Sequence, residues 1–371
     1  MAVKLKDLSE QTLLITGATS GIGLCTARMA AERGARLMLV ARNEDALRRL
    51  CDEINGNGGQ ARFVAGDVAN EALLREAAER AVSEFGGIDT WVNNAGGSIY
   101  GRIMDVPNED LRRLFETNVW GVVNGSKLAV EFMGERGGAL INVGSEVSDA
   151  VVPLQGMYSA SKHAVKGFTD ALRMELEADG YPISVTLIKP TAIHTPFTEN
   201  ARNYLPYEPQ LPPPVYAPEL VADAILYCAE NPMRDFFVGE MAKIHSTMAH
   251  WMPRTGDIMN EWIIDSAQNS GRPAVENRPD GLYETNSRLS ERGSTERYVM
   301  EESPYVRTQM HPLLTAGLLV GGGVALTAWL TNRMRSRGFT DDGVRVQRDQ
   351  RLELESGPGL ERFNRSSAGG F

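Results

Sequence analysis

The stretch TGATSGIG, residues 16–23, continues directly from the apolar run TLLIT at 12–16. Its glycines, Gly17, Gly21 and Gly23, stand where a strand turns sharply into a helix and where backbone can approach a ligand closely. Amide groups at the start of a helix attract an anion, and the pyrophosphate of a dinucleotide is the natural candidate. A glycine-rich turn without a ligand is the alternative when this stretch is taken alone.

Short β-branched or apolar runs recur over the first 245 residues, and helical stretches of ten or more residues separate most of them. The expected strands are 12–16, 36–41, 62–65, 88–94, 139–143, 183–188 and 235–239. The expected helices include 43–54, 70–85, 109–133 and 157–179. This alternation predicts an α/β fold of Rossmann type, a doubly wound parallel sheet of about seven strands with helices on both faces.

Composition narrows the class of protein. The 371 residues include 48 acidic and 38 basic ones, an excess that argues against a nucleic-acid-binding surface. Cys25, Cys51 and Cys228 are widely spaced and form no metal-binding pattern, which favours a reducing compartment and predicts no metal site. The N-terminal residues lack the apolar core and cleavage site of a signal peptide, so we expect a cytosolic catalytic domain.

The character of the chain changes after residue 245. We divide it into a catalytic domain (1–245), a polar extension or linker (246–312) with one short helix near 258–267, an apolar helix (313–330) and a disordered tail (331–371). No internal repeat is apparent.

The apolar segment LLTAGLLVGGGVALTAWL, residues 313–330, contains no charge and would span about 27 Å as a helix. Gly317 and Gly321 form a G-x-x-x-G pattern, which lets two helices approach closely. We expect membrane association, against the alternative of a buried or dimer-packing helix. Three arginines downstream, at 333, 335 and 337, favour a cytosolic flank and hence a re-entrant or interfacial helix.

Arg42 follows the second expected strand, where a dinucleotide fold meets the adenosine ribose. An arginine there accommodates a 2′-phosphate, so NADP(H) is favoured over NAD(H). A solvated charge at the start of a helix is the alternative, since Glu44 and Asp45 follow closely. Asp67, after the third strand, is a candidate for the adenine amino group and equally a candidate helix N-cap.

Tyr158 and Lys162 are four residues apart in Y-S-A-S-K. On a helix they point the same way, and a nearby ammonium lowers the pKa of a phenol toward the range of a general acid or base. A Y-x-x-x-K pattern alone is common by chance, and a surface pair is the alternative. Ser145 stands thirteen residues upstream, just past the strand 139–143, at the edge where open parallel sheets bind ligands.

Together these motifs resemble the short-chain dehydrogenase/reductase family over residues 10 to about 240. The matched pieces, in the family's order and spacing, are T-G-x-x-x-G-I-G at 16–23, N-N-A-G at 93–96, Asn118, Ser145 and Tyr158-x-x-x-Lys162. The resemblance implies an NAD(P)-dependent oxidoreductase that transfers a hydride between NADP(H) and a carbonyl or secondary alcohol. It also implies a homo-oligomer.

The resemblance implies a role for each matched residue. Tyr158 would act as general acid or base, Ser145 would orient the substrate oxygen, Lys162 would bind the nicotinamide ribose, and Asn118 would hold a water of a proton relay. The implied cofactor-binding residues are Gly17, Thr19, Ser20, Gly21, Ile22, Gly23, Arg42, Asp67, Val68, Asn94, Ala95, Gly96, Tyr158, Lys162, Pro190 and Thr195.

Two positions depart from the family pattern: Gly144 stands where a second serine is common, and Thr191 where a glycine usually follows the proline. Thr195 would lie near the carboxamide, or only shape its loop with Pro190. The long Pro- and Tyr-rich segment 200–219 is interpreted as a wall for an apolar or bulky small-molecule substrate, or as structural packing. The alternative function is a non-catalytic dinucleotide-binding scaffold or redox-sensing module attached to a membrane.

Overall fold

A computed structural model of the chain describes residues 3–285, 288–295 and 297–311, together with residues 327, 329, 330 and 333. Residues Met1–Met310 make up one unit and His311–Phe371 a second. The predicted tail at 331–371 lies outside the described residues except for residue 333, and the fold below is that of the first unit.

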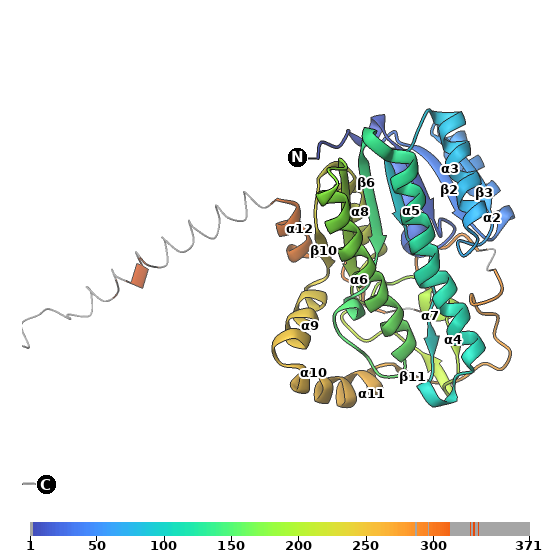
Figure 1. Cartoon of the computed structure of the whole chain (residues 1–371). Helices are drawn as coiled ribbons and strands as arrows, with labels where there is room; N and C mark the ends of the chain where they lie inside the picture. The colour runs from blue at the N-terminus through green and yellow to red at the C-terminus, as the bar shows by residue number, and fades with distance from the viewer. Residues whose placement is uncertain are drawn as a thin grey trace, which may run out of the picture. The chain divides into compact units, whose positions relative to one another are not determined.

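A seven-stranded sheet lies at the centre of the unit, in the order β10-β7-β6-β4-β1-β2-β3 (Figure 1). All neighbouring strands are parallel, which confirms the predicted Rossmann-type fold. In chain order the strands are β1 Thr12–Thr16, β2 Arg36–Ala41, β3 Gln60–Ala65, β4 Thr90–Asn93, β6 Gly138–Val143, β7 Ile183–Pro190 and β10 Asp235–Val238.

Helices cover both faces of the sheet because its strands are apolar on both sides. On β1, Leu13 and Ile15 belong to one buried cluster and Leu14 to another, since successive side chains point to opposite faces. The first cluster includes residues of α1 Gly21–Glu32, α2 Glu44–Gly56 and α8 Pro218–Glu230. The second includes residues of α3 Glu71–Phe85, α5 Gly121–Met133 and α6 Gly156–Ala178.

The single helix predicted over 109–133 is divided. α4 spans Asn108–Phe115 and α5 begins at Gly121, and a π-helical turn, Glu116–Trp120, joins them. Such a turn widens one helical turn by a residue and often marks a functional site. Here it carries Asn118, which is fully buried.

The extension after residue 240 packs against the Rossmann domain. It comprises α9 Glu240–Trp251, α10 Pro253–Met259, a π-helical turn Asn260–Ile264, α11 Asp265–Ala267, β11 Asn269–Pro273 and α12 Pro304–Met310. β11 pairs with β9 Tyr207–Pro209, and α12 contacts α8 and β10. Of the two alternatives, a polar extension or a linker, the structure favours an extension of the same unit, because Leu282 and Val306 supply buried apolar side chains that the polar composition conceals.

The segment after β7 also has more structure than the sequence indicates. α7 spans Phe197–Asn200, and β8 Arg202–Asn203 pairs with β5 Ile99–Tyr100. Among the described residues, no helix has the length and apolar character needed to cross a bilayer. The apolar helix predicted at 313–330 lies outside those residues except at 327, 329 and 330.

Candidate active site

The turn between β1 and α1 forms a cradle that only glycine fits. Gly17 has φ +68°, a conformation that residues with a Cβ rarely adopt, and a Cβ on Gly23 would lie 2.3 Å from the Gly17 carbonyl oxygen. α1 begins at Gly21, so its first amides face the same cleft. These features fit the pyrophosphate of a dinucleotide, as the sequence predicts.

A cleft lies at the carboxyl edge of the sheet, and nearly all the site residues predicted from the sequence line it. Every predicted site residue lines this cleft except Gly23 and Asn118. The lining residues from the prediction are Gly17, Thr19, Ser20, Gly21, Ile22, Arg42, Asp67, Val68, Asn94, Ala95, Gly96, Ser145, Tyr158, Lys162, Pro190 and Thr195.

Arg42 is not a solvated charge at the start of a helix. Its guanidinium donates to the carbonyl oxygen of Gly281 at 2.5 Å and to that of Leu282 at 3.3 Å. Burial lowers its pKa, while the carboxylate of Asp67 opposes this effect. The residue that the sequence assigns to the adenosine phosphate is thus held by the extension.

Asp67 follows β3 and lines the same cleft as Arg42. Its Oδ1 accepts from the amide of Ala69 at 2.9 Å, and its Oδ2 pairs with the guanidinium of Arg113. The N-cap of α3 is Asn70, whose side chain accepts from Ala72, so the interpretation of Asp67 as the helix cap is wrong. Arg113 on α4 is a basic residue of the adenosine end that sequence reasoning missed, because only the fold brings α4 beside β3.

Tyr158 and Lys162 lie on one face of α6, with the lysine Nζ 5.8 Å from the centre of the phenol ring. That Nζ donates to the carbonyl oxygen of Val143 at 2.8 Å. Ser145 follows β6 and caps the short 3-10 turn Glu146–Ser148, and its Oγ accepts from the amide of Val147 at 3.3 Å. Ser145 and Tyr158 both line the cleft, and their side chains share a hydrogen bond.

Asn118 links the segment after β4 to α6 through its hydrogen bonds. Its Oδ1 accepts from the amide of Gly97 at 2.9 Å, and its Nδ2 donates to the carbonyl oxygen of Gly97 and the Oγ of Ser161, each at 3.0 Å. These bonds fix the segment after β4 against α6. The π-helical turn is what directs the Asn118 side chain toward both.

Burial dominates the acid–base properties of the pair. It raises the pKa of Tyr158 to about 12, although a hydrogen bond with Ser145 opposes the rise. It lowers the pKa of Lys162 from its ordinary value of 10.5 to about 8. The prediction that the lysine lowers the pKa of the phenol is therefore wrong for this structure, because the ammonium is directed to the Val143 carbonyl and desolvation outweighs its influence.

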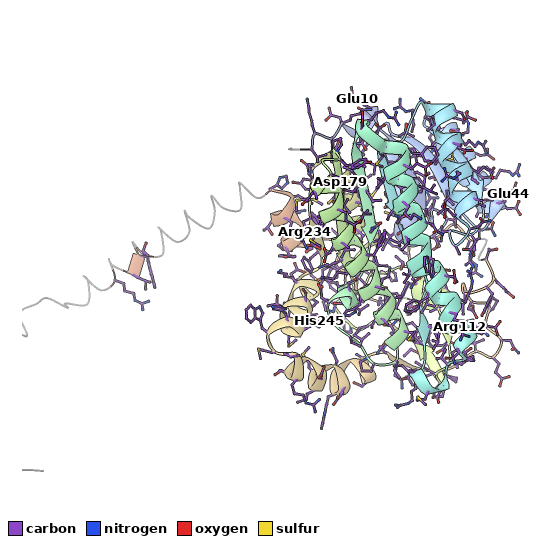
Figure 2. The ribbon with its side chains drawn as sticks, viewed as in Figure 1. Glu10, Glu44, Arg112, Asp179, Arg234 and His245 are labelled. Carbon is purple, nitrogen blue, oxygen red and sulfur yellow. The ribbon has the colours of Figure 1, made fainter. Side chains whose placement is uncertain are left out.

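Glu146, next to Ser145, joins three parts of the site. Its Oε2 accepts from the Oγ1 of Thr191 at 2.9 Å and lies 2.9 Å from the Nδ1 of His245. This carboxylate raises the pKa of His245 above its ordinary value. His245 belongs to α9 (Figure 2), so Thr191, the departure from the family pattern, connects the loop after β7 to the extension.

The far end of the cleft is mainly apolar. The segment 200–219 contributes Leu211 and Pro212, but its tyrosines do not line the cleft among the described residues. Tyr204 donates to Asp110, and Tyr216 donates to Glu240 at 2.5 Å, so these rings pack rather than cover the substrate. The uncharged lining side chains at this end are Ser98, Tyr100, Leu114, Val147, Val152, Gln155, Phe197, Asn200, Leu211, Pro212, Gln268 and Leu282.

A comparison with known families identifies the class of protein. The family model described as short chain dehydrogenase matches residues 11–205, so the chain belongs to that family. The match ends before the extension, which the family pattern therefore does not describe.

Individual relatives extend the comparison. The chain is 43% identical over 330 residues to an uncharacterized oxidoreductase, YxnA, of Bacillus subtilis, covering 88% of this chain and 92% of that protein. It is 36% identical over 194 residues to a 3-ketodihydrosphingosine reductase of Bacteroides thetaiotaomicron, covering 52% and 68%. The first alignment is longer than the Rossmann domain, so similarity to YxnA includes part of the extension.

Solved structures agree with the fold. A short-chain type dehydrogenase/reductase from Mycobacterium marinum matches with a TM-score of 0.55 and 31% identity, covering 62% of this chain and 95% of that one. An alcohol dehydrogenase from Thermococcus sibiricus, complexed with 5-hydroxy-NADP, matches with a TM-score of 0.54 and 25% identity, covering 62% and 94%. The chain is thus an oxidoreductase of the short-chain dehydrogenase family.

Proposed function

We propose that the protein is an NADP(H)-dependent oxidoreductase acting on a carbonyl compound or the corresponding secondary alcohol, with Tyr158 as the proton donor. The carrying observation is that Ser145, Tyr158 and Lys162 meet in the cleft that begins at the glycine cradle. A non-catalytic binding module has no need of all three side chains.

When bound, the nicotinamide supplies the hydride, and the protein supplies position and a proton. Ser145 donates a hydrogen bond to the substrate oxygen and orients it, while the Tyr158 hydroxyl gives its proton to that oxygen. Lys162 holds the ribose hydroxyls with the same ammonium that donates to the Val143 carbonyl. Asn118, through its bonds to Gly97 and Ser161, keeps the surrounding wall in place.

The high pKa of Tyr158 favours the reductive direction. With a pKa of about 12, nearly all of the phenol carries its proton at neutral pH, which is the state that a general acid requires. Oxidation of an alcohol needs the phenolate instead, which burial disfavours. The protonated phenol is therefore in the state that the general acid of a carbonyl reduction requires.

The preference for NADP(H) rests on Arg42 and Arg113. Both guanidinium groups lie at the end of β2 and β3 where the adenosine ribose would bind, and Arg42 lines the cleft. Asp67 is paired with Arg113, so its charge is offset. The relative from Thermococcus sibiricus that is complexed with 5-hydroxy-NADP is in keeping with this preference.

The substrate that this cleft fits is neutral and largely apolar. Apart from the catalytic Lys162, the charged side chains that line the cleft are Arg42, Asp67 and Glu146. Glu146 is itself a carboxylate, paired with His245, so it offers no positive charge to bind an acidic substrate. Gln155 and Gln268 supply polar groups for a second contact.

The sequence supports two further proposals, on the oligomeric state of the protein and on its association with a membrane. The family resemblance implies a homo-oligomer, and residues 313–330 are proposed to associate with a membrane. The relative named 3-ketodihydrosphingosine reductase is in keeping with an apolar substrate.

The test of the function replaces Tyr158 by Phe and follows NADPH absorbance with a panel of ketones, steroids, retinoids, acyl-ketones and sugars. Loss of the general acid should lower kcat by about 10²–10⁴-fold while NADPH affinity changes little. Tyr181→Phe is the matched control, since Tyr181 is 39% exposed beyond the end of the same helix. Near-normal turnover of Tyr158→Phe on a substrate that the wild type reduces would refute the assignment.

A further inference from the structure

The turn Asp280–Tyr283 of the extension crosses the candidate active site. Its Gly281 and Leu282 carbonyl oxygens accept from Arg42, and the Leu282 carbonyl also accepts from Arg113 at 3.1 Å. Gly281 and Leu282 both line the cleft. The turn therefore engages the adenosine end of the site directly.

The same turn is anchored at the substrate end. The Gly281 amide donates to the carbonyl oxygen of Asn200 at 2.6 Å, and the Tyr283 hydroxyl donates to Asp110 at 2.8 Å. The Leu282 side chain is 6% exposed and packs in the apolar cluster that contains Tyr158. One turn thus spans the two ends of the cleft that the proposed function assigns to cofactor and substrate.

A second contact of the extension lies at the phosphate end. The amide of Gly21, at the first position of α1, donates to the carbonyl oxygen of Ser290 at 2.9 Å. This amide is one of the helix N-terminal donors that face a pyrophosphate in dinucleotide folds. In the structure, donors assigned to both the adenosine and pyrophosphate parts of the cofactor are bonded to backbone carbonyls of the extension.

We propose that the turn Asp280–Tyr283 is a clamp of the cofactor site, which must open for the dinucleotide to enter or leave. The inference rests on the proposed function, because it assumes that the cleft binds NADP(H). While the turn is open, the Arg42 guanidinium gives up its bonds to the Gly281 and Leu282 carbonyl oxygens and binds acceptor groups of the cofactor instead. Leu282 then closes over the bound molecule, so the extension controls how fast the cofactor exchanges.

The anchor to weaken is the Tyr283 hydroxyl, because its removal leaves the apolar wall and every backbone bond intact. Asp280 provides a second anchor, since its Oδ2 accepts from the guanidinium of Arg202 on β8 at 3.4 Å, while its Oδ1 accepts from the Leu282 amide within the turn at 2.9 Å. Tyr298→Phe is the matched control: Tyr298 belongs to the same extension and is 87% exposed. All variants are made in the full-length chain, and a thermal melt verifies their folding.

Stopped-flow fluorescence measures the association and dissociation rates of NADPH. Tyr283→Phe and Asp280→Ala should each raise both rates by about three- to tenfold, as expected from loss of the side-chain hydrogen bond that ties the turn to the domain, with Kd changed by less than about threefold. Tyr298→Phe should match the wild type. A clamp raises both rates together, whereas damage to the binding surface raises only dissociation.

Unchanged association rates in both variants would overturn the clamp, whether or not dissociation becomes faster. Hydrogen exchange of the wild type gives an independent measurement if either variant folds poorly. NADPH should slow exchange of the Gly281 and Leu282 amides by at least about tenfold, and equal exchange with and without NADPH would also overturn the clamp. A wild type that binds no NADPH would instead contradict the proposed function itself.

Discussion

Replacing Lys162 by Met should stabilise the protein at neutral pH while abolishing its proposed activity. The Lys162 side chain is buried, and burial lowers its pKa from 10.5 to about 8. At pH 7 the amine is charged in both the folded and the unfolded chain, so the folded state carries the cost of desolvating that charge. Met has a similar length and no charge to desolvate.

The size of the effect follows from this pKa difference. A shift of about 2.5 pH units corresponds to roughly 3 kcal/mol of destabilisation by Lys162 at pH 7. Met loses the hydrogen bond to the Val143 carbonyl and leaves that oxygen unpaired, which costs about 1–3 kcal/mol. The expected net gain at pH 7 is therefore about 0–2 kcal/mol.

The dependence on pH is the sharper part of the prediction. Between the folded pKa and the unfolded one, the unfolded chain binds more protons, so the wild type becomes more stable as pH rises from about 8 toward 10.5. The methionine of the variant cannot titrate, and the free energy of unfolding of Lys162→Met should fall relative to the wild type by about 2–3 kcal/mol between pH 7 and pH 10. The sign of the difference should reverse within this range.

Urea unfolding of both proteins at several pH values measures this difference, with Lys127→Met as a control at an exposed position on α5. Other groups titrate equally in both proteins and cancel. A Lys162→Met variant that is less stable than the wild type by the same amount at pH 7 and pH 10 would refute the reasoning, because it would mean that the buried amine is not desolvated as the structure indicates. NADPH-dependent turnover should be lost at every pH.

The remaining predictions concern the cofactor and the tail. Arg42→Asp should shift preference from NADPH toward NADH by at least about tenfold in the ratio of kcat/KM values, because a carboxylate repels a 2′-phosphate and accepts from a 2′-hydroxyl; an unchanged ratio would place recognition of the phosphate elsewhere, with Arg113 the next residue to test. Deleting residues 311–371 should move the protein from the membrane pellet to the supernatant after centrifugation, and a full-length protein that already stays in the supernatant without detergent contradicts membrane association.

The fold could be predicted from the sequence because its signals are local. Each sheet strand is a short apolar run, and the run-to-run spacing leaves room for a crossover helix. The π-helical turn Glu116–Trp120 gave no such signal, since a single extra residue in one turn changes no apolar periodicity. The packing of the extension was also concealed, because Leu282 and Val306 are isolated apolar residues in a polar segment.

The candidate site was predictable where its residues belong to motifs or stand at the carboxyl end of an expected strand, as Arg42 and Ser145 do. The glycine cradle and the pair Tyr158 and Lys162 lie within eight and five residues of sequence, respectively. Arg113 and His245, in contrast, reach the site from a helix that the motifs do not include and from the extension. No spacing rule connects either residue to the positions that they contact.

The pKa of Tyr158 separates what spacing determines from what packing determines. A separation of four residues on a helix ensures that the amine and the phenol share a face, and this much follows from geometry. Whether the amine lowers the pKa depends on where its charge is directed and on how much water surrounds the ring. Here the amine donates to the Val143 carbonyl and the ring is buried. Desolvation therefore has the largest effect on the pKa of the phenol, which keeps its proton. A phenol in that state serves a reductase directly, whereas an alcohol-oxidising enzyme would first need the positive charge of an oxidised nicotinamide beside it to offset the burial.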